Sequence, residues 1–353
     1  MKKILGIFRG FPGLGRVVSG ISLLETLQMK HNCDIEIITY LQGSEYLASK
    51  GLQGGYTVCP ADYCSIGLLP TNKMGVSIHS KIKAFKPDLV IIDGEPLILQ
   101  SLRISYPSLK IVALMNPADV DNPQNDKEAM DYFNALYQLS DLAIIHGLRA
   151  IVPQYPYKDY ISIKTILRPE ILGIKNKPSN NIYCILGGGT VNAEPAFVDS
   201  TVKIGELCKS AAEYLPEYNM HIICSSPNIC NAISSGKGNV FIHREVMNAA
   251  DYYFDACLVI TRSGRNTLSE LAYLGIPTIS FISGCAYRQV EQKQNMDNID
   301  SDGVISSDLS VNPTEFALTC RSAIETKYAS SHFEPGNEVA VNRVLEILNS
   351  YSL

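Results

Sequence analysis

The chain has 353 residues, of which 46% are hydrophobic and 18% charged, with 25 glycines and 18 prolines; this predicts about two domains and excludes a disordered or collagen-like chain. Thirty basic against 35 acidic side chains leave a net charge of −5, so no general attraction to nucleic acid is expected. The ten cysteines include no C-x-x-C pair and are typical of buried thiols in a reducing cytoplasm.

The N-terminal segment predicts a strand rather than a signal peptide. Its apolar run, Ile4 to Phe8, is cut short by Arg9, Gly10 and Pro12. Nowhere does the sequence approach the roughly 18 consecutive apolar residues that a membrane-spanning helix needs. We therefore expect a cytoplasmic protein whose membrane association is peripheral at most.

Short apolar runs recur along the chain with helical stretches between them. In the first half they are Ile4–Phe8, Ile35–Tyr40, Leu89–Ile92, Ile111–Met115 and Leu142–Ile145. In the second half they are Ile182–Leu186, Met220–Cys224, Val240–Ile242, Leu258–Thr261 and Thr278–Ile282. Apolar runs without polar alternation are typical of strands buried on both faces of a parallel sheet. The sequence therefore predicts an α/β protein with two Rossmann-like, doubly wound domains.

A segment rich in Pro, Gly, Asn and Lys separates the two halves. We take residues 1–166 as the N-terminal domain, 167–181 as the linker and 182–336 as the C-terminal domain. The C-terminal segment 337–353 carries apolar residues at helical spacing, which predicts an amphipathic helix that packs back on the N-terminal domain.

In an open doubly wound sheet, ligands bind beyond the carboxyl ends of the strands, so the loops that follow strands deserve inspection. The first strand leads into a glycine loop with Gly13, Gly15 and Arg16, and then into a helix. Glycines permit close approach of a ligand to the backbone, and a helix start offers unpaired N–H groups to anions. The loop does not fit G-x-G-x-x-G, and a tight turn without a ligand is the alternative.

Asp93 ends the strand predicted at Leu89–Ile92. A carboxylate in that place can accept a proton from an incoming hydroxyl, which makes Asp93 a candidate general base. The alternative is that Asp93 only caps the following helix.

Two further loops lie in the second half. Gly188 and Gly189, within a run of three glycines before Thr190, predict a backbone nest for a phosphate, with a plain flexible turn as the alternative. The strand at Leu258–Thr261 leads into a helix start that is crowded with polar and small residues, which favours a diphosphate. These residues are Ser263, Gly264, Asn266 and Thr267.

Glu270 has two interpretations. Together with Thr267 it fits a T-x-x-E capping box, in which the glutamate returns a hydrogen bond to the helix start. Alternatively it binds a ligand at that helix end. Gly275 is expected to stop the helix, and Glu291 and Gln292 follow the next strand at the same edge of the sheet.

These motifs together resemble the GT-B glycosyltransferases of family 28, the undecaprenyl-muramyl-peptide N-acetylglucosaminyltransferases and their relatives. The family's R-S-G-x-x-T-x-S-E segment is present from Arg262 to Glu270 and is followed by L-G-I-P at Leu274–Pro277. An E-Q-x-x-N element follows at Glu291–Asn295. The resemblance covers most of the chain, and its specific motifs lie in the second half.

The resemblance implies a UDP-sugar held mainly by the C-terminal domain, facing an interdomain cleft. Glu270 would bind the ribose hydroxyls, Ser263 and Gly264 would lie near the phosphates, and the backbone near Val246 would read the uracil edge. Glu291 and Gln292 would contact the sugar.

In the first domain the family's glycine loop usually ends in histidine, where this chain has Arg16. Arginine stays charged and cannot act as a general base. Asp93 therefore becomes the expected base, supported by a D-F-E-P element in relatives where this chain has Asp93–Pro96. Arg16 would instead stabilise a phosphate or an acidic acceptor.

The expected reaction is an inverting, metal-independent transfer of a hexose from a UDP-sugar to a hydroxyl or amine of a small molecule. Neither the D-x-D at Asp119–Asp121 nor the six histidines indicate a metal site, and no cofactor is expected. The alternatives are a UDP-sugar hydrolase or epimerase of the same fold, a non-catalytic nucleotide-sugar-binding partner and, least favoured, a nicotinamide-dependent dehydrogenase.

Overall fold

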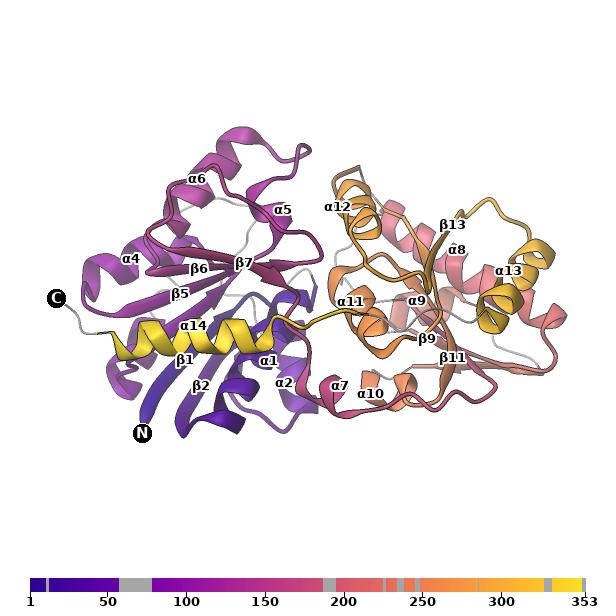
Figure 1. Cartoon of the computed structure of the whole chain (residues 1–353), viewed down its shortest axis with the longest axis horizontal. Coiled ribbons are helices and arrows are strands. Elements are labelled where there is room, and N and C mark those ends of the chain that lie inside the picture. Colours follow the sequence, from indigo (N-terminus) through magenta and orange to yellow (C-terminus); the bar gives the residue numbers. More distant parts are fainter. Residues whose placement is uncertain are drawn as a thin grey trace. The chain divides into compact units, whose positions relative to one another are not determined.

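The computed structural model describes residues 1–10, 13–56, 78–186, 195–224, 227–233, 238–244, 248–284, 286–326 and 332–350. Its contacts divide the chain into two compact units, each a parallel sheet with helices on both faces (Figure 1). Unit 1 comprises Met1–Pro169 and Gly336–Leu353, and unit 2 comprises Glu170–Pro335.

The sheet of unit 1 has the order β3-β2-β1-β4-β5-β6-β7, and all its neighbours pair in parallel. Its strands are β1 (Lys2–Phe8), β2 (Cys33–Tyr40), β3 (Gly55–Tyr56), β4 (Leu89–Asp93), β5 (Lys110–Met115), β6 (Leu142–Gly147) and β7 (Tyr160–Lys164). The chain reverses its direction of winding between β1 and β4, and the crevice above these two strand ends is the place where such sheets bind ligands.

Helices cover both faces of this sheet, which explains the apolar runs of its inner strands β1, β4, β5 and β6. Leu89 and Ile91 of β4 pack in one core with α1 (Gly15–Lys30) and α14 (Asn337–Asn349), whereas Val90 and Ile92 pack in the other with α4 (Leu97–Ser105) and α6 (Lys127–Tyr137). The C-terminal helix α14 packs against α1 and β5 within unit 1. The remaining helices of the unit are α2 (Gln42–Ser49) and α5 (Pro117–Val120).

The sheet of unit 2 repeats this winding in the order β10-β9-β8-β11-β12-β13, again all parallel. Its strands are β8 (Asn181–Ile185), β9 (Asn219–Ile223), β10 (Val240–His243), β11 (Ala256–Arg262), β12 (Thr278–Phe281) and β13 (Val304–Ser307). The switch in winding lies between β8 and β11.

One face of this second sheet packs against α8 (Pro195–Ala211), the 3-10 turn Ala212–Tyr214, α9 (Pro227–Ala232) and α13 (Pro313–Glu325). The other face packs against α7 (Pro169–Gly173), α10 (Ala249–Tyr253) and α11 (Arg265–Leu274). Helix α12 (Ala286–Asp297) contacts α11.

The predicted fold class, with two doubly wound parallel sheets, is confirmed, and each apolar run that predicted a strand lies in one. Three strands were not predicted. β3 spans two residues, β7 is an edge strand without a fully buried residue, and β13 is short and half serine, so none has the continuous apolar run of an inner strand. Within the described ranges, none of the helices has the length and apolar character needed to cross a membrane.

Candidate functional site

Arg16 joins the carboxyl ends of three neighbouring strands of unit 1. It lies in the first turn of α1, directly after the β1 loop, and its Nη1 donates to Oδ1 of Asp93 at 2.7 Å. The same guanidinium makes a two-pronged pair with Asp119, with Nη2 to Oδ1 at 2.6 Å and Nη1 to Oδ2 at 3.0 Å. Since Asp93 ends β4 and Asp119 lies in α5 after β5, the three groups gather where β1, β4 and β5 end.

The backbone next to this cluster leaves room for the Arg16 side chain only because residue 94 is glycine. Gly94 has φ +78°, and a Cβ there would lie 2.3 Å from Cδ of Arg16 and 2.8 Å from Cβ of Arg9. Asp119 is held in turn by its own helix start, where its Oδ2 accepts the backbone N–H of Asn116 at 2.9 Å. The Arg16 side chain therefore packs against Gly94 and is held by the charge-assisted hydrogen bonds to Asp119.

The cluster holds two carboxylates around one guanidinium. Burial disfavours the charged form of Arg16, but the Asp119 and Asp93 carboxylates outweigh it and raise the pKa of Arg16 well above its ordinary value. A guanidinium at hydrogen-bond distance favours the charged form of a carboxyl group. The N-cap position of α4 is occupied by Pro96, so Asp93 is not the N-cap residue of that helix.

Glu95, only two residues further along, has a different environment. Its carboxyl group is 2% exposed and accepts a hydrogen bond from the Tyr40 hydroxyl at the end of β2. Burial raises the pKa of Glu95 to about 7, although the Tyr40 hydrogen bond and the charges of Arg9 and Arg16 act in the opposite direction. Because β1 lies between β2 and β4, the Glu95–Tyr40 contact passes over the end of β1.

The two glycines of the predicted β1 loop differ in their structural role. A Cβ on Gly13 would meet nothing within 4 Å, so sterics do not require glycine there. Gly15 is the first residue of α1, and its carbonyl accepts a hydrogen bond from the Ser19 hydroxyl.

In unit 2, the corresponding strand end is cationic. Arg262 ends β11, at the switch in winding of this sheet, and Arg288 of α12 lies close enough to affect it. Burial, and then the positive charge of Arg288, lower the pKa of Arg262 to about 9. Because the charge of the buried Arg262 is disfavoured by burial and by the nearby Arg288, an anion bound at this strand end would stabilise it.

The residues after Arg262 are held to the end of β12 and to α12. Ser263 is fully buried, with its hydroxyl 2.8 Å from the hydroxyl of Ser280, and its carbonyl accepts from Asn295 Nδ2 at 3.0 Å. Gly264 is exposed and is the N-cap of α11, without a side-chain cap. The first-turn N–H groups of α11, which include those of Asn266 and Thr267, lack partners within the helix.

The side-chain amide of Gln292 is hydrogen-bonded to the backbone of the loop after β12. Its Oε1 accepts the N–H of Ser283 at 2.7 Å, and its Nε2 donates to the carbonyl of Ser283 at 3.0 Å. The neighbouring Glu291 side chain is 20% exposed and lies 3.4 Å from Nη1 of Arg288. The E-Q-x-x-N element thus contributes one amide that fixes a loop and one carboxylate beside the cationic strand end.

Glu270 lies buried in the middle of α11, with 1% exposure. The helix begins after Gly264 and ends at Leu274 with Gly275 in the left-handed conformation, which confirms the predicted stop. Thr267 is therefore the third residue of the helix rather than its N-cap. This contradicts the capping-box interpretation of Glu270, because the T-x-x-E spacing falls wholly inside the helix.

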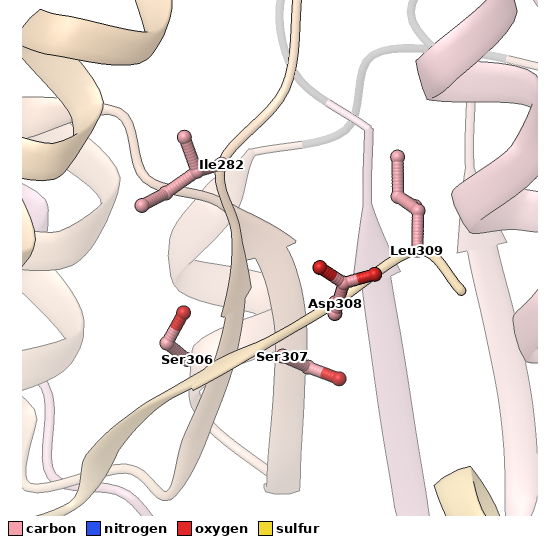
Figure 2. A pocket seen from close by; sticks show the side chains of 5 residues that line it. All are labelled: Ile282, Ser306, Ser307, Asp308 and Leu309. Atoms are coloured by element: carbon pink, nitrogen blue, oxygen red, sulfur yellow. The ribbon is translucent and has the colours of Figure 1, made fainter. Parts of the chain in front are cut away.

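A pocket of about 430 Å³ lies at the carboxyl ends of β12 and β13 (Figure 2). Its lining residues are Ile282, Ser306, Ser307, Asp308 and Leu309. Hydrogen bonds from Ser310 hold the pKa of Asp308 below its usual value, so this carboxylate is charged at neutral pH. The negative charge makes the pocket a poorer place for a phosphate than the end of β11.

Four predicted ligand residues, Gly188, Gly189, Thr190 and Val246, lie outside the described residues. Among the residues that are described, no group of three or more His, Cys, Asp or Glu side chains could hold a metal ion.

Sequence reasoning gave no ligand-site role to Asp119, Glu95 or Arg288. For Asp119 a signal existed: it stands three residues after Asn116 at a strand end, the spacing that the structure uses as a capping box. For Glu95 the signal was its place in the segment Asp93–Pro96, which corresponds to a D-F-E-P element in relatives. Arg288 had no local signal, because its neighbour Arg262 is remote in sequence.

Comparison with known proteins gives one family match, which lies in the C-terminal part of the chain. Residues 225–304 match the model of the glycosyltransferase family 28 C-terminal domain, a range that contains Arg262, Glu270 and Gln292. No curated protein sequence matches the chain significantly.

Solved structures resemble the whole chain. The glycotransferase of kitacinnamycin is 14% identical with a TM-score of 0.61, over 98% of this chain and 94% of that one. MurG of Acinetobacter baumannii is 15% identical with a TM-score of 0.57, over 99% of both chains. UDP-GlcNAc 2-epimerase from Neisseria meningitidis, bound to UDP-GlcNAc, is 14% identical with a TM-score of 0.56, over 98% of this chain and 99% of that one. At these identities the likeness establishes the fold.

Proposed function

Because this chain has the GT-B fold and carries a glycosyltransferase family 28 C-terminal domain, we propose that it is a UDP-sugar-dependent hexosyltransferase acting on a hydroxyl or amine of a small-molecule acceptor. One observation carries the proposal. Arg262 ends β11 at the switch in winding, where burial and the like charge of Arg288 leave a cationic site without an acidic residue in the first turn of α11. A diphosphate is the ligand that this arrangement favours.

The donor would be bound as follows. Arg262 and the N–H groups after Gly264 bind the diphosphate, and Glu270 accepts hydrogen bonds from the ribose hydroxyls. Glu291 lies beside Arg288 and would contact the sugar. Gly188, Gly189, Thr190 and Val246 keep their proposed contacts with the phosphates and the uracil. Gln292 would act indirectly, because its amide already holds the Ser283 backbone.

The proposed reaction is an inverting displacement that needs no metal ion. The acceptor oxygen forms a bond to the anomeric carbon, and the bond from that carbon to the phosphate oxygen breaks. UDP leaves with the electron pair, and Arg262 with the helix start stabilises its charge. A carboxylate of unit 1 receives the acceptor proton.

A second candidate is a UDP-sugar hydrolase or 2-epimerase. It is supported by the likeness to the meningococcal 2-epimerase and by Arg16, which stands where the resembling transferases carry histidine and is tied to Asp93 and Asp119. Incubation with UDP-GlcNAc alone separates the candidates: a 2-epimer, or free sugar with UDP, favours the second, whereas turnover that needs an added acceptor favours transfer. UDP binding without any turnover would point to a non-catalytic binding protein.

The proposal is tested by thermal unfolding with UDP, with UDP-GlcNAc and with NAD. UDP at about 100 times its dissociation constant should stabilise the protein by roughly 2.7 kcal/mol, and NAD should not. Glu270→Gln and Arg262→Ala should weaken UDP binding, whereas Glu325→Gln, an exposed carboxylate of the same unit, should leave it unchanged. A protein that UDP does not stabilise would contradict the proposed function.

A further inference from the structure

Asp93 and Glu95 both lie at the end of β4, but their carboxyl groups have different partners. Asp93 lies on the side of α1 and is paired with Arg16, with 2.7 Å between Oδ1 and Nη1. Glu95 extends the other way, across the end of β1 to Tyr40 of β2. The left-handed turn at Gly94 separates the two directions.

The environment of Asp93 suits a permanent anion rather than a proton acceptor. Its side chain is 2% exposed, and a proton placed on it would remove one of the two carboxylates that compensate the buried charge of Arg16. Removing one partner of a buried ion pair is destabilising because it leaves the other charge uncompensated. Asp119 has the same constraint, since both of its oxygens accept from Arg16 and one also accepts the Asn116 N–H.

The environment of Glu95 suits a group that gains and loses a proton near neutral pH. The charged and titratable groups that act on it come from the neighbouring strand ends: Tyr40 at the end of β2, Arg9 after β1 and Arg16 in the first turn of α1. Burial raises its pKa to about 7 in spite of the two arginines. Catalysis by a general base is most efficient when its pKa lies near the working pH.

Glu95 also lies at the right place in the fold. Its contact with Tyr40 crosses the crevice between β1 and β4, where the winding of the sheet switches and where ligands of doubly wound sheets bind. A backbone hydrogen bond connects the ends of β1 and β4 at this place, because the N–H of Arg9 donates to the carbonyl of Asp93 at 2.9 Å.

We propose that Glu95, and not Asp93, is the general base of unit 1 and receives the proton of the attacking nucleophile. This inference rests on the proposed function. As the nucleophile's oxygen bonds to the anomeric carbon and UDP departs with the electron pair, the O–H proton moves to the Glu95 carboxylate, which later releases it to water. Tyr40 is a positioning residue that donates a hydrogen bond to one carboxylate oxygen of Glu95. The Asp93–Arg16–Asp119 cluster fixes the neighbouring strand ends through its ion pairs.

The test measures UDP release from UDP-GlcNAc with water and with a panel of alcohols as nucleophiles, as a function of pH. In the wild type, kcat/KM should fall below a pKa near 7. Glu95→Gln keeps the acceptor oxygen for Tyr40 and should lower kcat roughly 100- to 10,000-fold. It should also remove that acidic limb and leave UDP binding unchanged. Tyr40→Phe removes a hydrogen bond that favours the charged carboxylate, so the limb should move to higher pH.

Asp93→Asn is the matched comparison at the same strand end. It should lower the rate but retain the acidic limb, because Glu95 is still present. An acidic limb that persists in Glu95→Gln, or that disappears in Asp93→Asn instead, would overturn the assignment while UDP binding and acceptor-dependent turnover by the wild type leave the proposed function intact. A wild type that binds UDP but does not cleave UDP-GlcNAc with any of these nucleophiles would also overturn the assignment. A wild type that binds no UDP would overturn the proposed function itself.

Discussion

Arg16 and Asp119 face each other through two parallel hydrogen bonds, with Nη2 2.6 Å from Oδ1 and Nη1 3.0 Å from Oδ2. The two residues are 103 positions apart in sequence. Paired guanidinium and carboxylate groups of this geometry are both strong and directional. The contact therefore fixes the start of α1 against the end of β5, with Asp93 held between them.

Loss of this pair should destabilise unit 1. Asp119→Asn removes the charge that faces Arg16, and we expect a loss of about 2 kcal/mol in the free energy of unfolding, as for a hydrogen bond between charged groups. Urea denaturation of the purified variant measures it. Asp121→Asn is the control from the same D-x-D segment: Asp121 is 61% exposed and pairs with Arg149, so its loss should change stability by no more than about 0.5 kcal/mol. Equal effects of the two substitutions would contradict the role given to Asp119.

Gly94 should be intolerant of any side chain. Its φ of +78° disfavours other residues, and the added Cβ of Gly94→Ala would collide with Arg16, so a loss of about 1–3 kcal/mol or more is expected. Gly13→Ala, in the adjacent loop, places its Cβ in open space and should leave thermal stability unchanged. If Gly13→Ala nevertheless lowers turnover, the glycine serves close approach of a ligand; a destabilised Gly13→Ala would contradict the steric argument.

Gln292 should matter for stability as well as for activity. Gln292→Ala leaves the N–H and the carbonyl of Ser283 without their side-chain partners, and two such losses amount to roughly 2 kcal/mol. Lys293→Ala, at the exposed neighbouring position of α12, serves as the control. Calorimetric unfolding of both variants, followed by UDP binding, separates the two roles. A Gln292→Ala variant as stable as the wild type, but unable to bind UDP-GlcNAc, would assign the amide to the ligand instead.

Glu95 should give stability a characteristic pH dependence. Its pKa is about 7 in the folded protein, whereas an unperturbed glutamate titrates near about 4.3. Between these values the folded protein keeps a proton that the unfolded chain has lost, so the contribution of Glu95 to stability decreases as the pH rises from about 4.5 to about 7 and is constant above that. The total change is on the order of 3 kcal/mol.

Unfolding free energies of the wild type and of Glu95→Gln, measured in urea from pH 4.5 to 8, isolate this contribution as their difference. The difference should vary over the lower part of this range and become level above pH 7 or so. A difference that is independent of pH would mean that the carboxyl group titrates like an exposed glutamate, and would remove one support for its role as a base.

The architecture follows from patterns that are local in the sequence. The apolar runs of β1, β4, β8 and β11 lack polar alternation, and such strands are stable only between two layers of helices. Local chemistry also determined where α11 ends, because Gly275 can adopt the left-handed conformation at no steric cost. These properties depend on residues that are close in sequence, and therefore they can be read without a structure.

The partners of the polar side chains, in contrast, depend on contacts between residues that are distant in the sequence. Asp93 was predicted as the general base, and the strand order brings Arg16, 77 residues away in sequence, to its carboxylate. The interpretation of Thr267 and Glu270 as a capping box was wrong because the helix begins earlier, at a glycine without a capping side chain. Gln292 was predicted to contact a ligand, and its amide is bound to the Ser283 backbone. Pairing of charges and burial of a carboxyl group depend on which strand ends are neighbours, and the chain fixes that order only when it folds.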